Sequence, residues 1–375
     1  MPGKCIPNIM VIMTKVSDFD FAVPPELVAQ TPAEKRDHSR LMVLDRAKQT
    51  IDHKHFYDIA DYLKPGDLLV LNDTKVMPAN LVGRKEDLFS EAQRAEEKGG
   101  AKVEVLLAKL MEPATERRGS IWECLVKPGK RLKVGSRVVF GENEVVGTVL
   151  EKTDSGEQII EFQGDLSAYI QAHGQVPLPP YINSALRTPH SALEDRYQTV
   201  YADKEGASAA PTAGLHFTPE LLDKVRAKGV KTANVTLHTG LATFKPIYAD
   251  NIEDHKMHSE YFEISGETIE AVRAAERVIA VGTTSVRALE AYADGILTTK
   301  AQRREGHKGD TNLYITPGYE FKIVDAMITN FHWPRTTLIL LVSAFAGKDF
   351  IMRAYQTAIE QKYRFFSFGD AMLIL

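Results

Sequence analysis

Cysteine is scarce in this chain of 375 residues, which contains only Cys5 and Cys124. Two cysteines exclude a disulfide-stapled scaffold and a zinc site built from cysteines, and they suit a reducing compartment. Cys124 lies in the segment IWECLV, where a small buried thiol is the simpler interpretation. The cysteine content therefore predicts a globular protein of cytoplasmic localisation.

Long apolar runs are also absent. The longest, LILLVSAFA (338–346), is far shorter than the roughly 20 residues that a membrane-spanning helix needs. The N-terminal NIMVIM is too short for the core of a signal peptide. We therefore expect no membrane partner, and we interpret residues 1–16 as a flexible N-terminal extension.

The chain has no excess of positive charge and none of several common motifs. Its net charge of -4 gives no global attraction to nucleic acid, so any RNA contact requires local patches. The glycine-rich dinucleotide fingerprint, the Walker A sequence, H-E-x-x-H, C-x-x-C and G-x-S-x-G are all missing. Nothing in these patterns indicates a metal site, and we expect none.

What the sequence does contain is two kinds of secondary-structure pattern. Residues 101–162 hold short β candidates such as KVEVLLA, RVVF and EVVGTVL, separated by the turn sequences KPGK, VGS, GEN and DSGE. Regular short strands of this kind predict a small all-β barrel or sandwich. The length of the chain independently suggests two domains.

Strands and helices alternate outside this block. TPELLDKVRAKG (218–229) predicts a helix with Thr218 as N-cap, Pro219 in its first turn and Gly229 as its stop. VIAVG (278–282) predicts a strand that runs into a helix. The predicted fold class is therefore α/β, with a mixed α/β domain (17–65 and 156–375) interrupted by a small antiparallel β-barrel domain (66–155).

The segment GASAAPTAGLHFT (206–218) is neutral and almost free of large aliphatic side chains. Small residues let the backbone approach a ligand closely, so the segment can be a loop that lines or covers a site. A tightly packed crossing between domains favours the same composition. The segment alone does not decide between these two interpretations.

Polar side chains follow three predicted strands. His238 and Thr239 end VTLHTG, Thr283 and Thr284 begin a helix after VIAVG, and ITNFHWP carries Asn330 and His332. Ligands of α/β sheets bind beyond the carboxyl ends of the strands, and a helix N-terminus favours anions. Each cluster also has a structural interpretation: a hydrogen-bonded histidine, an N-cap, or an ion pair of Arg287 with Glu290. Their joint occurrence favours a composite binding site.

One local stretch, KPGKRLKVGSR (127–137), is strongly basic. It contains five cations and no acid, and cations of this kind contact phosphates. Basic surface turns are common without such a role. The candidate RNA-binding residues of this stretch are Lys127, Lys130, Arg131, Lys133 and Arg137.

Taken together, these segments resemble a known family. The matching sequences include LVLNDTKVMPANL (69–81), GASAAPTAGLHFT (206–218), VTLHTGLATFKPI (235–247), RVIAVGTTSVRALE (277–290) and TNFHWPRTTLILLVSAFAG (329–347). They occur in order from about residue 17 to the C-terminus. The chain resembles the S-adenosylmethionine:tRNA ribosyltransferase-isomerases of queuosine biosynthesis.

The resemblance implies a fold, a reaction and two substrates. The fold is an α/β domain with an inserted β-barrel. The reaction moves the ribosyl part of S-adenosylmethionine to 7-aminomethyl-7-deazaguanine at the wobble position of a tRNA with a GUN-type anticodon. The ribose is isomerised, epoxyqueuosine-tRNA forms, and adenine and methionine leave. S-adenosylmethionine is a substrate, no cofactor is obligatory, and we expect a monomer.

The resemblance and the chemistry together predict site residues. We predict His216 and His238 as general acid and base, Arg287 with Thr283 and Thr284 as the methionine carboxylate site, and Asn330 and His332 as contacts of ribose or adenine. Weaker catalytic candidates are Asp45 and Asp73, which follow apolar strands. Further substrate-binding candidates are Thr212, Gly214, Leu215 and Thr239.

Two other functions remain open at this point. An S-adenosylmethionine-dependent tRNA methyltransferase would release S-adenosylhomocysteine instead of adenine and methionine. A non-catalytic tRNA-binding protein would leave the small neutral loop and the strand-end histidines without a task. Product analysis separates all three.

Overall fold

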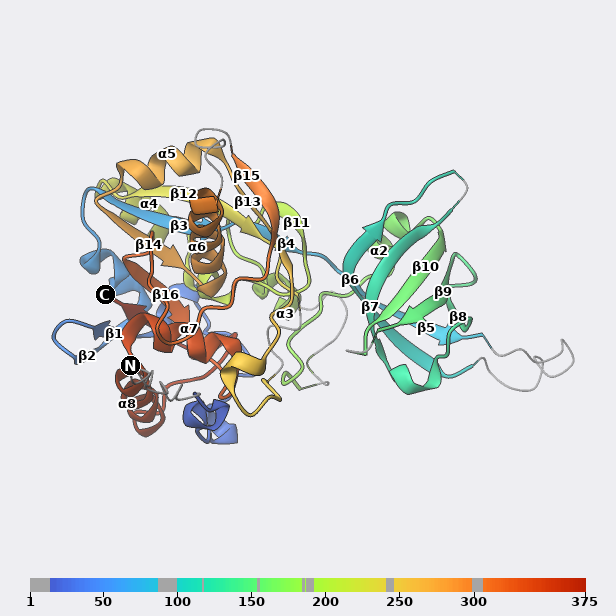
Figure 1. Ribbon diagram of the computed structural model, residues 1–375, viewed down its shortest axis with the longest axis horizontal. Coiled ribbons are helices and arrows are strands. Elements are labelled where there is room, and N and C mark those ends of the chain that lie inside the picture. Colours follow the sequence, from blue (N-terminus) through green and yellow to red (C-terminus); the bar gives the residue numbers. More distant parts are fainter. Residues whose placement is uncertain are drawn as a thin grey trace, which may run out of the picture.

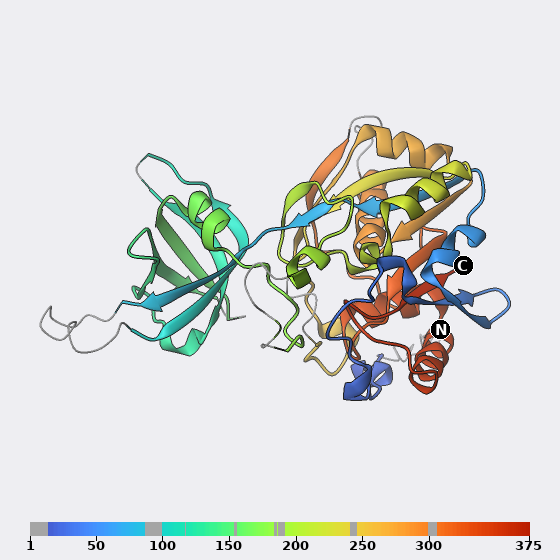
Figure 2. The ribbon, with the colours of Figure 1, turned by 180° about the vertical axis from the view of Figure 1, so that it is seen from behind.

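Two bodies of different architecture are joined by a pair of chain segments (Figure 1, Figure 2). The structure, a computed structural model, describes residues 14–86, 100–116, 118–153, 156–183, 186, 192–240, 246–298 and 306–375. The larger body is a mixed sheet with helices on both faces, and the smaller is a closed barrel. The predicted fold class is confirmed.

The large sheet has nine strands among the described residues. From edge to edge they are β15 (His307–Thr311), β13 (Glu260–Ile264), β12 (Lys231–Leu237), β3 (Asp67–Asn72), β14 (Arg277–Val281), β16 (Ala326–Asn330), β17 (Ala371–Ile374), β1 (Arg40–Asp45) and β2 (Thr50–His55). Four central neighbours, β12, β3, β14 and β16, run parallel. β17 pairs antiparallel with β16, and β1 runs parallel to β17. β1 therefore runs opposite to the central four.

The barrel is antiparallel and closed. Its strands, in the order of pairing, are β10 (Gln158–Gly164), β7 (Ser120–Lys127), β6 (Lys102–Glu112), β5 (Asn80–Lys85), β8 (Arg137–Phe140) and β9 (Val145–Lys152). A separate two-stranded parallel sheet joins β4 (Thr74–Val76) to β11 (Lys204–Ala207) near the point where the chain enters the barrel.

Helices cover the large sheet on both faces. The described helices are α2 (Leu166–His173), α3 (Ala192–Arg196), α4 (Pro219–Ala227), α5 (Gly266–Ala274), α6 (Thr283–Thr298), α7 (Thr337–Ala346) and α8 (Lys348–Glu360). Side chains of α5, α6, α7 and α8 share one hydrophobic core with the sheet, and α4 contributes to a second. None of the described helices is long and apolar enough to cross a membrane.

The sequence of β3 explains why this sheet lies between two layers. Leu68 and Val70 enter the core under α5 to α8, whereas Leu69 and Leu71 enter the core under α4. Successive side chains of a strand point to opposite faces, so a strand buried on both sides reads as a continuous apolar run. The segment LLVL meets this requirement.

Helix α4 begins and ends as its sequence predicts. The Thr218 side chain accepts a hydrogen bond from the backbone N–H of Leu221 at 3.1 Å, and Pro219 occupies the first turn. Gly229 has a φ of 84°, a conformation that favours glycine after a helix. The N-cap and the glycine stop are therefore confirmed.

The limits of the barrel strands differ from the predicted limits of 66 and 155. β3 lies in the middle of the large sheet, and the first barrel strand begins at Asn80. At the other end β10 continues to Gly164, because it forms a hairpin with β9. The two connecting segments pair where they cross, through reciprocal 3.0 Å hydrogen bonds between the backbones of Asn80 and Gln175.

Most of the extension predicted over 1–16 lies outside the described residues. The described part does not behave as a flexible extension, because Val16 is buried and its N–H donates to the Asp250 carbonyl at 3.0 Å. An apolar side chain that fits the core explains the difference.

Candidate active site

Four parallel strands bring their carboxyl ends to one edge of the large sheet, and a cavity lies there. Six predicted site residues line it: Thr212, Thr239, Thr283, Thr284, Asn330 and His332. They come from the loop 206–218 and from the chain that follows β12, β14 and β16. The three strand-end clusters thus meet in one place.

The small-residue loop combines the two roles considered for it. Residues 210–213 line the cavity. On either side the loop is tightly packed, since a Cβ at Gly206 would lie 2.6 Å from the His238 ring and one at Gly214 would lie 2.0 Å from the Tyr201 hydroxyl. The N–H groups of Ser208 and Ala209 donate to the Thr239 carbonyl. Close packing therefore holds the lining segment against β12.

Three hydroxyls in the cavity wall have no hydrogen-bond partner among the described residues. They are the buried side-chain oxygens of Thr239, Thr284 and Ser367. A buried hydroxyl without a partner costs free energy, so such groups commonly await a ligand or a water molecule. Thr283 and Thr284 also begin the 16-residue helix α6, whose N-terminal dipole attracts an anion. The wall is therefore suited to a polar, anionic group.

His332 is the one titratable side chain among the described residues that line the cavity. Its Nε2 lies 2.7 Å from the Thr329 hydroxyl, and no described residue pairs with Nδ1. Burial lowers the pKa of the His332 imidazole to about 3. The ring is therefore neutral near pH 7, and its Nδ1 accepts a proton in the tautomer in which Nε2 donates to the Thr329 hydroxyl.

His216 does not face the cavity as a free acid or base. Its Nδ1 lies 2.7 Å from the Ser39 hydroxyl and its Nε2 lies 3.1 Å from the Asn330 side-chain nitrogen. The ring also stacks on Phe56. Because both nitrogens are occupied, the geometry differs from the predicted catalytic role. His216 instead fixes Asn330, whose Oδ1 accepts a 2.9 Å hydrogen bond from Thr212 in the cavity wall.

His238 also differs from its predicted role as the partner of His216 across one site. Its Nδ1 lies 2.8 Å from the Thr74 hydroxyl, its ring stacks on Tyr261, and it is not part of the cavity wall. Burial lowers the pKa of the His238 imidazole. The ring occupies the space that Gly206 leaves open, so it packs the loop against β12.

Arg287 is engaged by a carboxylate of the protein, although not by Glu290. Its Nη1 forms an ion pair with Glu260 of β13, and its Nε donates to the Leu313 carbonyl at 3.2 Å. Glu290 instead accepts hydrogen bonds from the backbone of residues 322–324. Glu260, whose Oε1 also accepts from Gly240, therefore engages Nη1 of Arg287, whereas Nη2 is buried and has no partner among the described residues.

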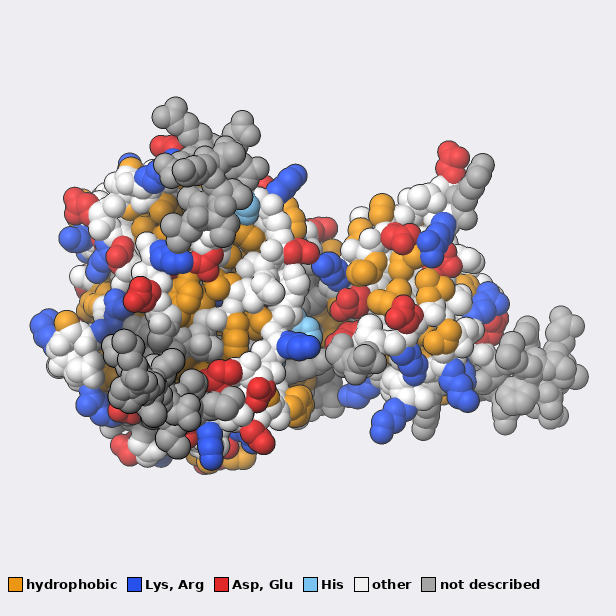
Figure 3. Space-filling view, viewed as in Figure 1, with side chains coloured by type: hydrophobic (Ala, Val, Ile, Leu, Met, Phe, Trp, Pro, Cys, Tyr) orange, Lys and Arg blue, Asp and Glu red, His pale blue; other side chains and the backbone are white. Residues whose placement is uncertain are grey.

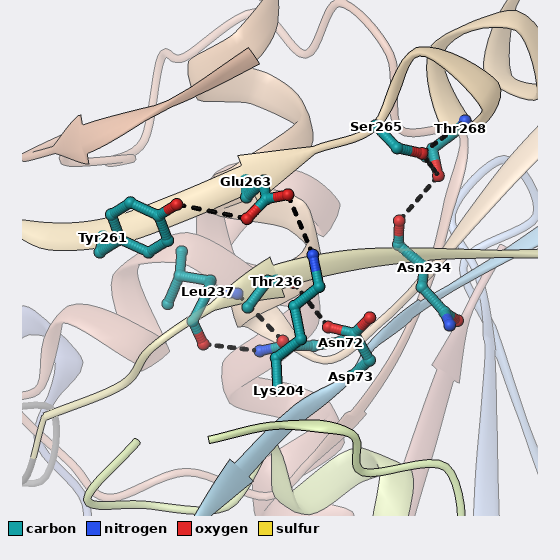
Figure 4. Close-up of polar contacts among 10 residues, drawn as sticks. All are labelled: Asn72, Asp73, Lys204, Asn234, Thr236, Leu237, Tyr261, Glu263, Ser265 and Thr268. Carbon is teal, nitrogen blue, oxygen red and sulfur yellow. Dashed lines mark hydrogen bonds and ion pairs between the residues drawn. The ribbon is translucent and has the colours of Figure 1, made fainter. Parts of the chain in front are cut away.

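The two aspartates lie in different places. Asp45 ends β1, which runs opposite to the central strands, so Asp45 lies at the other edge of the sheet and pairs with Lys48. The structure therefore does not bring Asp45 to the cavity. Asp73 does follow β3 at the cavity edge, where its carboxylate accepts a 2.6 Å hydrogen bond from Thr236 (Figure 4).

Asp73 faces a polar cluster rather than the cavity. Lys204 lies between Asp73 and Glu263, and it donates to Glu263 at 3.0 Å (Figure 4). Burial raises the pKa of the Asp73 carboxyl, although the Thr236 hydrogen bond and the Lys204 charge act the other way. This cluster links β3, β11, β12 and β13 beside the cavity.

Leu215 and Gly214 are buried behind the cavity wall. Leu215 lines a second, smaller cavity together with Arg36, Arg196 and His216. Arg36 and Arg196 donate only to backbone carbonyls in this region, and burial lowers the pKa of both guanidinium groups. The sequence prediction missed these two arginines, as well as Ser39 and Trp333. Nothing in the sequence pointed to these residues except that they lie in segments that resemble the family.

The described residues contain no cluster of metal-ligating side chains. No group of three His, Cys, Asp or Glu side chains within the described ranges is arranged to hold an ion.

The cations predicted to bind RNA lie on the barrel and are mostly exposed. Lys127, Lys130 and Lys133 point to solvent, and Arg137 pairs with Glu86 at 2.8 Å. The Arg131 side chain lies outside the described residues.

The buried His216 predicts a specific sensitivity to acid. Burial and the cations Arg364 and Arg36 lower the pKa of its imidazole from 6.5 to about 3. Between these values the unfolded chain binds a proton that the folded protein does not, so stability is lost as the pH falls below about 6.5. The free energy of unfolding falls between pH 7 and pH 5 in the unvaried protein. In His216→Gln, which cannot titrate at this position, we expect this fall to be smaller by about 2 kcal/mol.

Urea denaturation at the two pH values measures this difference. The same pH dependence in both proteins would contradict a buried, uncharged His216 ring.

Comparison with known proteins agrees with the geometry of the site. A family model described as "Queuosine biosynthesis protein" matches residues 16–374. The S-adenosylmethionine:tRNA ribosyltransferase-isomerase of Caldanaerobacter subterraneus subsp. tengcongensis is 51% identical over 371 residues, and that of Thermotoga maritima is 48% identical over 365 residues. Each match covers 96% of this chain and 100% of the relative.

A solved structure is similar over the same extent. The crystal structure of the S-adenosylmethionine tRNA ribosyltransferase from Thermotoga maritima has a TM-score of 0.52 and 39% identity to this chain. It covers 96% of this chain and 100% of the solved one. The chain therefore belongs to the family of queuosine biosynthesis proteins.

Proposed function

We propose that this protein transfers and isomerises the ribosyl moiety of S-adenosylmethionine onto 7-aminomethyl-7-deazaguanine at the wobble position of tRNA. The products are epoxyqueuosine-tRNA, adenine and methionine. The names of the relatives support this activity. The observation that carries the proposal is the cavity at the strand ends, whose wall holds unpartnered hydroxyls, a helix N-terminus and one neutral histidine.

The donor's methionine carboxylate binds at the start of α6 in this proposal. Thr283 and Thr284 offer hydroxyls and free N–H groups there, and the helix dipole stabilises the negative charge. Arg287 supports this position indirectly, because its pair with Glu260 fixes the helix one turn further on. Thr239 and Asn330 lie on the same wall and contact the ribosyl part.

The chemistry begins from the donor's sulfonium. The positive sulfur makes the neighbouring ribose 5′ hydrogens acidic and later leaves as the neutral thioether of methionine. His332 accepts the 5′ proton at Nδ1, in the tautomer in which Nε2 donates to the Thr329 hydroxyl. Departing adenine takes up this proton from His332 as its bond to the ribose breaks, and the neutral aminomethyl group of the base forms a C–N bond to the ribose and releases one proton to solvent. The donor brings its own activation, so the proposed reaction uses no further cofactor.

The loop 206–218 excludes water from the cavity. Residues 210–213 form one wall, and Trp333 and Phe366 form an apolar wall of the same cavity. An opened ribose intermediate would otherwise be hydrolysed. The packed glycines on either side hold this wall in place.

The barrel contacts the tRNA in this proposal. Its visible face carries both Lys/Arg and Asp/Glu side chains (Figure 3), so the contact is local rather than spread over the domain. The exposed Lys127, Lys130 and Lys133 border the turn that follows β7. The GUN-type anticodon, the cytoplasmic localisation and the monomeric state remain predictions from the sequence.

Adenine release is the test of the proposed reaction. We expect the protein, incubated with S-adenosylmethionine and tRNA carrying 7-aminomethyl-7-deazaguanine, to yield equal amounts of adenine and methionine on a reversed-phase column. In His332→Gln we expect kcat to fall about 100-fold or more, because the base is lost. His53→Gln, on the distant edge strand β2, is the matched control.

S-adenosylhomocysteine as the product would instead identify a methyltransferase. No product at all would favour a tRNA-binding protein. A normal kcat in His332→Gln would remove His332 from the mechanism without affecting the reaction assigned.

Thr284→Val separates donor binding from stability. Valine has the shape of threonine without the hydroxyl, so we expect the free energy of unfolding to stay the same or rise by about 1 kcal/mol. We expect the apparent KM for S-adenosylmethionine to rise about ten-fold. The control is Ser285→Ala, whose hydroxyl donates to the Val281 carbonyl at 2.7 Å and should affect stability but not KM. An unchanged KM in Thr284→Val would refute the carboxylate site.

The barrel contact predicts a change in salt dependence. In the double variant Lys130→Ala, Lys133→Ala, the tRNA Kd should rise, and the slope of log Kd against log salt should fall by about 0.7 to 0.9 per lysine. Lys224→Ala, exposed on α4, is the control and should change neither quantity. Filter binding between about 50 and 200 mM salt measures the Kd and the slope. Over this range the affinity from phosphate contacts falls by orders of magnitude. Equal slopes would place the RNA elsewhere.

A further inference from the structure

A third hollow lies beside the cavity of the proposed donor site. It has a volume of about 570 Å³, and its walls include Tyr181, Pro246, Tyr248, Trp333, Pro334 and Arg335. Trp333 belongs to the walls of both hollows. This aromatic cleft therefore borders the site proposed above across Trp333, and the proposed mechanism does not use it.

The aromatic groups of the cleft are of two kinds. Trp333 is held firmly, because its ring stacks on Phe366 with 3.6 Å between centroids and Tyr181 packs against it edge-on. Tyr248 is the most exposed large hydrophobic side chain among the described residues, at 83%. An exposed aromatic side chain that shares a cleft with a fixed aromatic ring offers surfaces on which nucleobases stack.

Arg335 adds a positive charge at the rim. Its backbone is anchored on both sides, since its N–H donates to the Phe19 carbonyl at 3.1 Å and its carbonyl accepts from Ile247 at 2.7 Å. Its φ of 55° is unusual for an arginine. The guanidinium is exposed, and no described residue forms an ion pair or hydrogen bond with it. The backbone thus holds a free cation beside the aromatic rings.

We propose that the aromatic cleft binds the tRNA nucleotide that neighbours the reacting base. This inference rests on the proposed function. A base that enters the cavity must leave its stack, so its neighbour loses a stacking partner. The cleft supplies a new one, with the neighbour's base on Tyr248 and Trp333 and its phosphate at Arg335. Guanidinium groups and aromatic faces are the usual partners of single-stranded nucleotides.

Two surface variants test the proposal without disturbing the core. Tyr248→Ala removes the exposed ring, and Tyr248→Phe keeps it. Arg335→Asn removes the charge while retaining a residue that tolerates the left-handed backbone. Lys362→Asn is the matched control, because Lys362 is also an exposed cation with a φ of 55° and is not part of the cleft. Tyr57→Ala, another partly exposed tyrosine, controls for the loss of a ring.

The readouts are the Kd for fluorescently labelled tRNA carrying 7-aminomethyl-7-deazaguanine and the KM values for both substrates. We expect Tyr248→Ala to raise the tRNA Kd and KM about ten-fold, and Tyr248→Phe to restore them. We expect Arg335→Asn to lower the salt slope of binding by about 0.7. The KM for S-adenosylmethionine should not change in any of these variants.

Three results would overturn the proposal. If Tyr248→Ala raises the KM for S-adenosylmethionine and not for tRNA, the cleft holds the adenosyl donor. If the Tyr248 and Arg335 variants bind tRNA as the unvaried protein and the controls do, the cleft does not contact the RNA. If Tyr248→Phe fails to restore binding, stacking is not the interaction. The binding arm needs no turnover, so failure of the proposed reaction and failure of this inference are distinguishable.

Discussion

The parallel alignment of β12, β3, β14 and β16 is the constraint on which the rest of the structure depends. Because these strands point the same way, the residues that follow them meet at one edge, although they are far apart in the sequence. The two hydrophobic cores hold the alignment by burying β3, β14 and β16 on both faces, and β12 packs on the first core through Val235 and Leu237. Moving any one of these strands by one residue would turn its side chains to the other face and scatter the cavity wall.

Local sequence patterns predicted the helices and strands well, but they did not predict the direction in which each strand runs in the sheet. The capping residues of α4, the strand before α6 and the short strands of the barrel were readable because the signals lie within a few residues. Asp45 lies away from the cavity because β1 runs against the central strands, and nothing near Asp45 in the sequence shows this direction. The contacts of Arg287 and His216 could not be predicted for a different reason, since their partners Glu260, Ser39 and Asn330 come from distant segments. Burial of a histidine cannot be read from its neighbours in sequence.

The donor and the acceptor occupy adjacent spaces in this account. The cavity offers the polar groups that a charged sulfonium donor needs, and the aromatic cleft offers the stacking surface that an unstacked nucleotide needs. Trp333 separates the two, held on one side by Phe366. His216 contributes by fixing Asn330 rather than by transferring protons. In the proposed function the inserted barrel adds a contact for the tRNA, and the chemistry belongs to the larger domain.

A crystal structure with S-adenosylmethionine bound is the most direct test of the convergence of strand ends on one donor site. This account places the methionine carboxylate within hydrogen-bonding distance of the N–H groups at the start of α6, with the ribose beside His332 and the Thr239 hydroxyl newly partnered. A donor bound away from this edge, with the Thr239 and Thr284 hydroxyls still unpartnered, would contradict it.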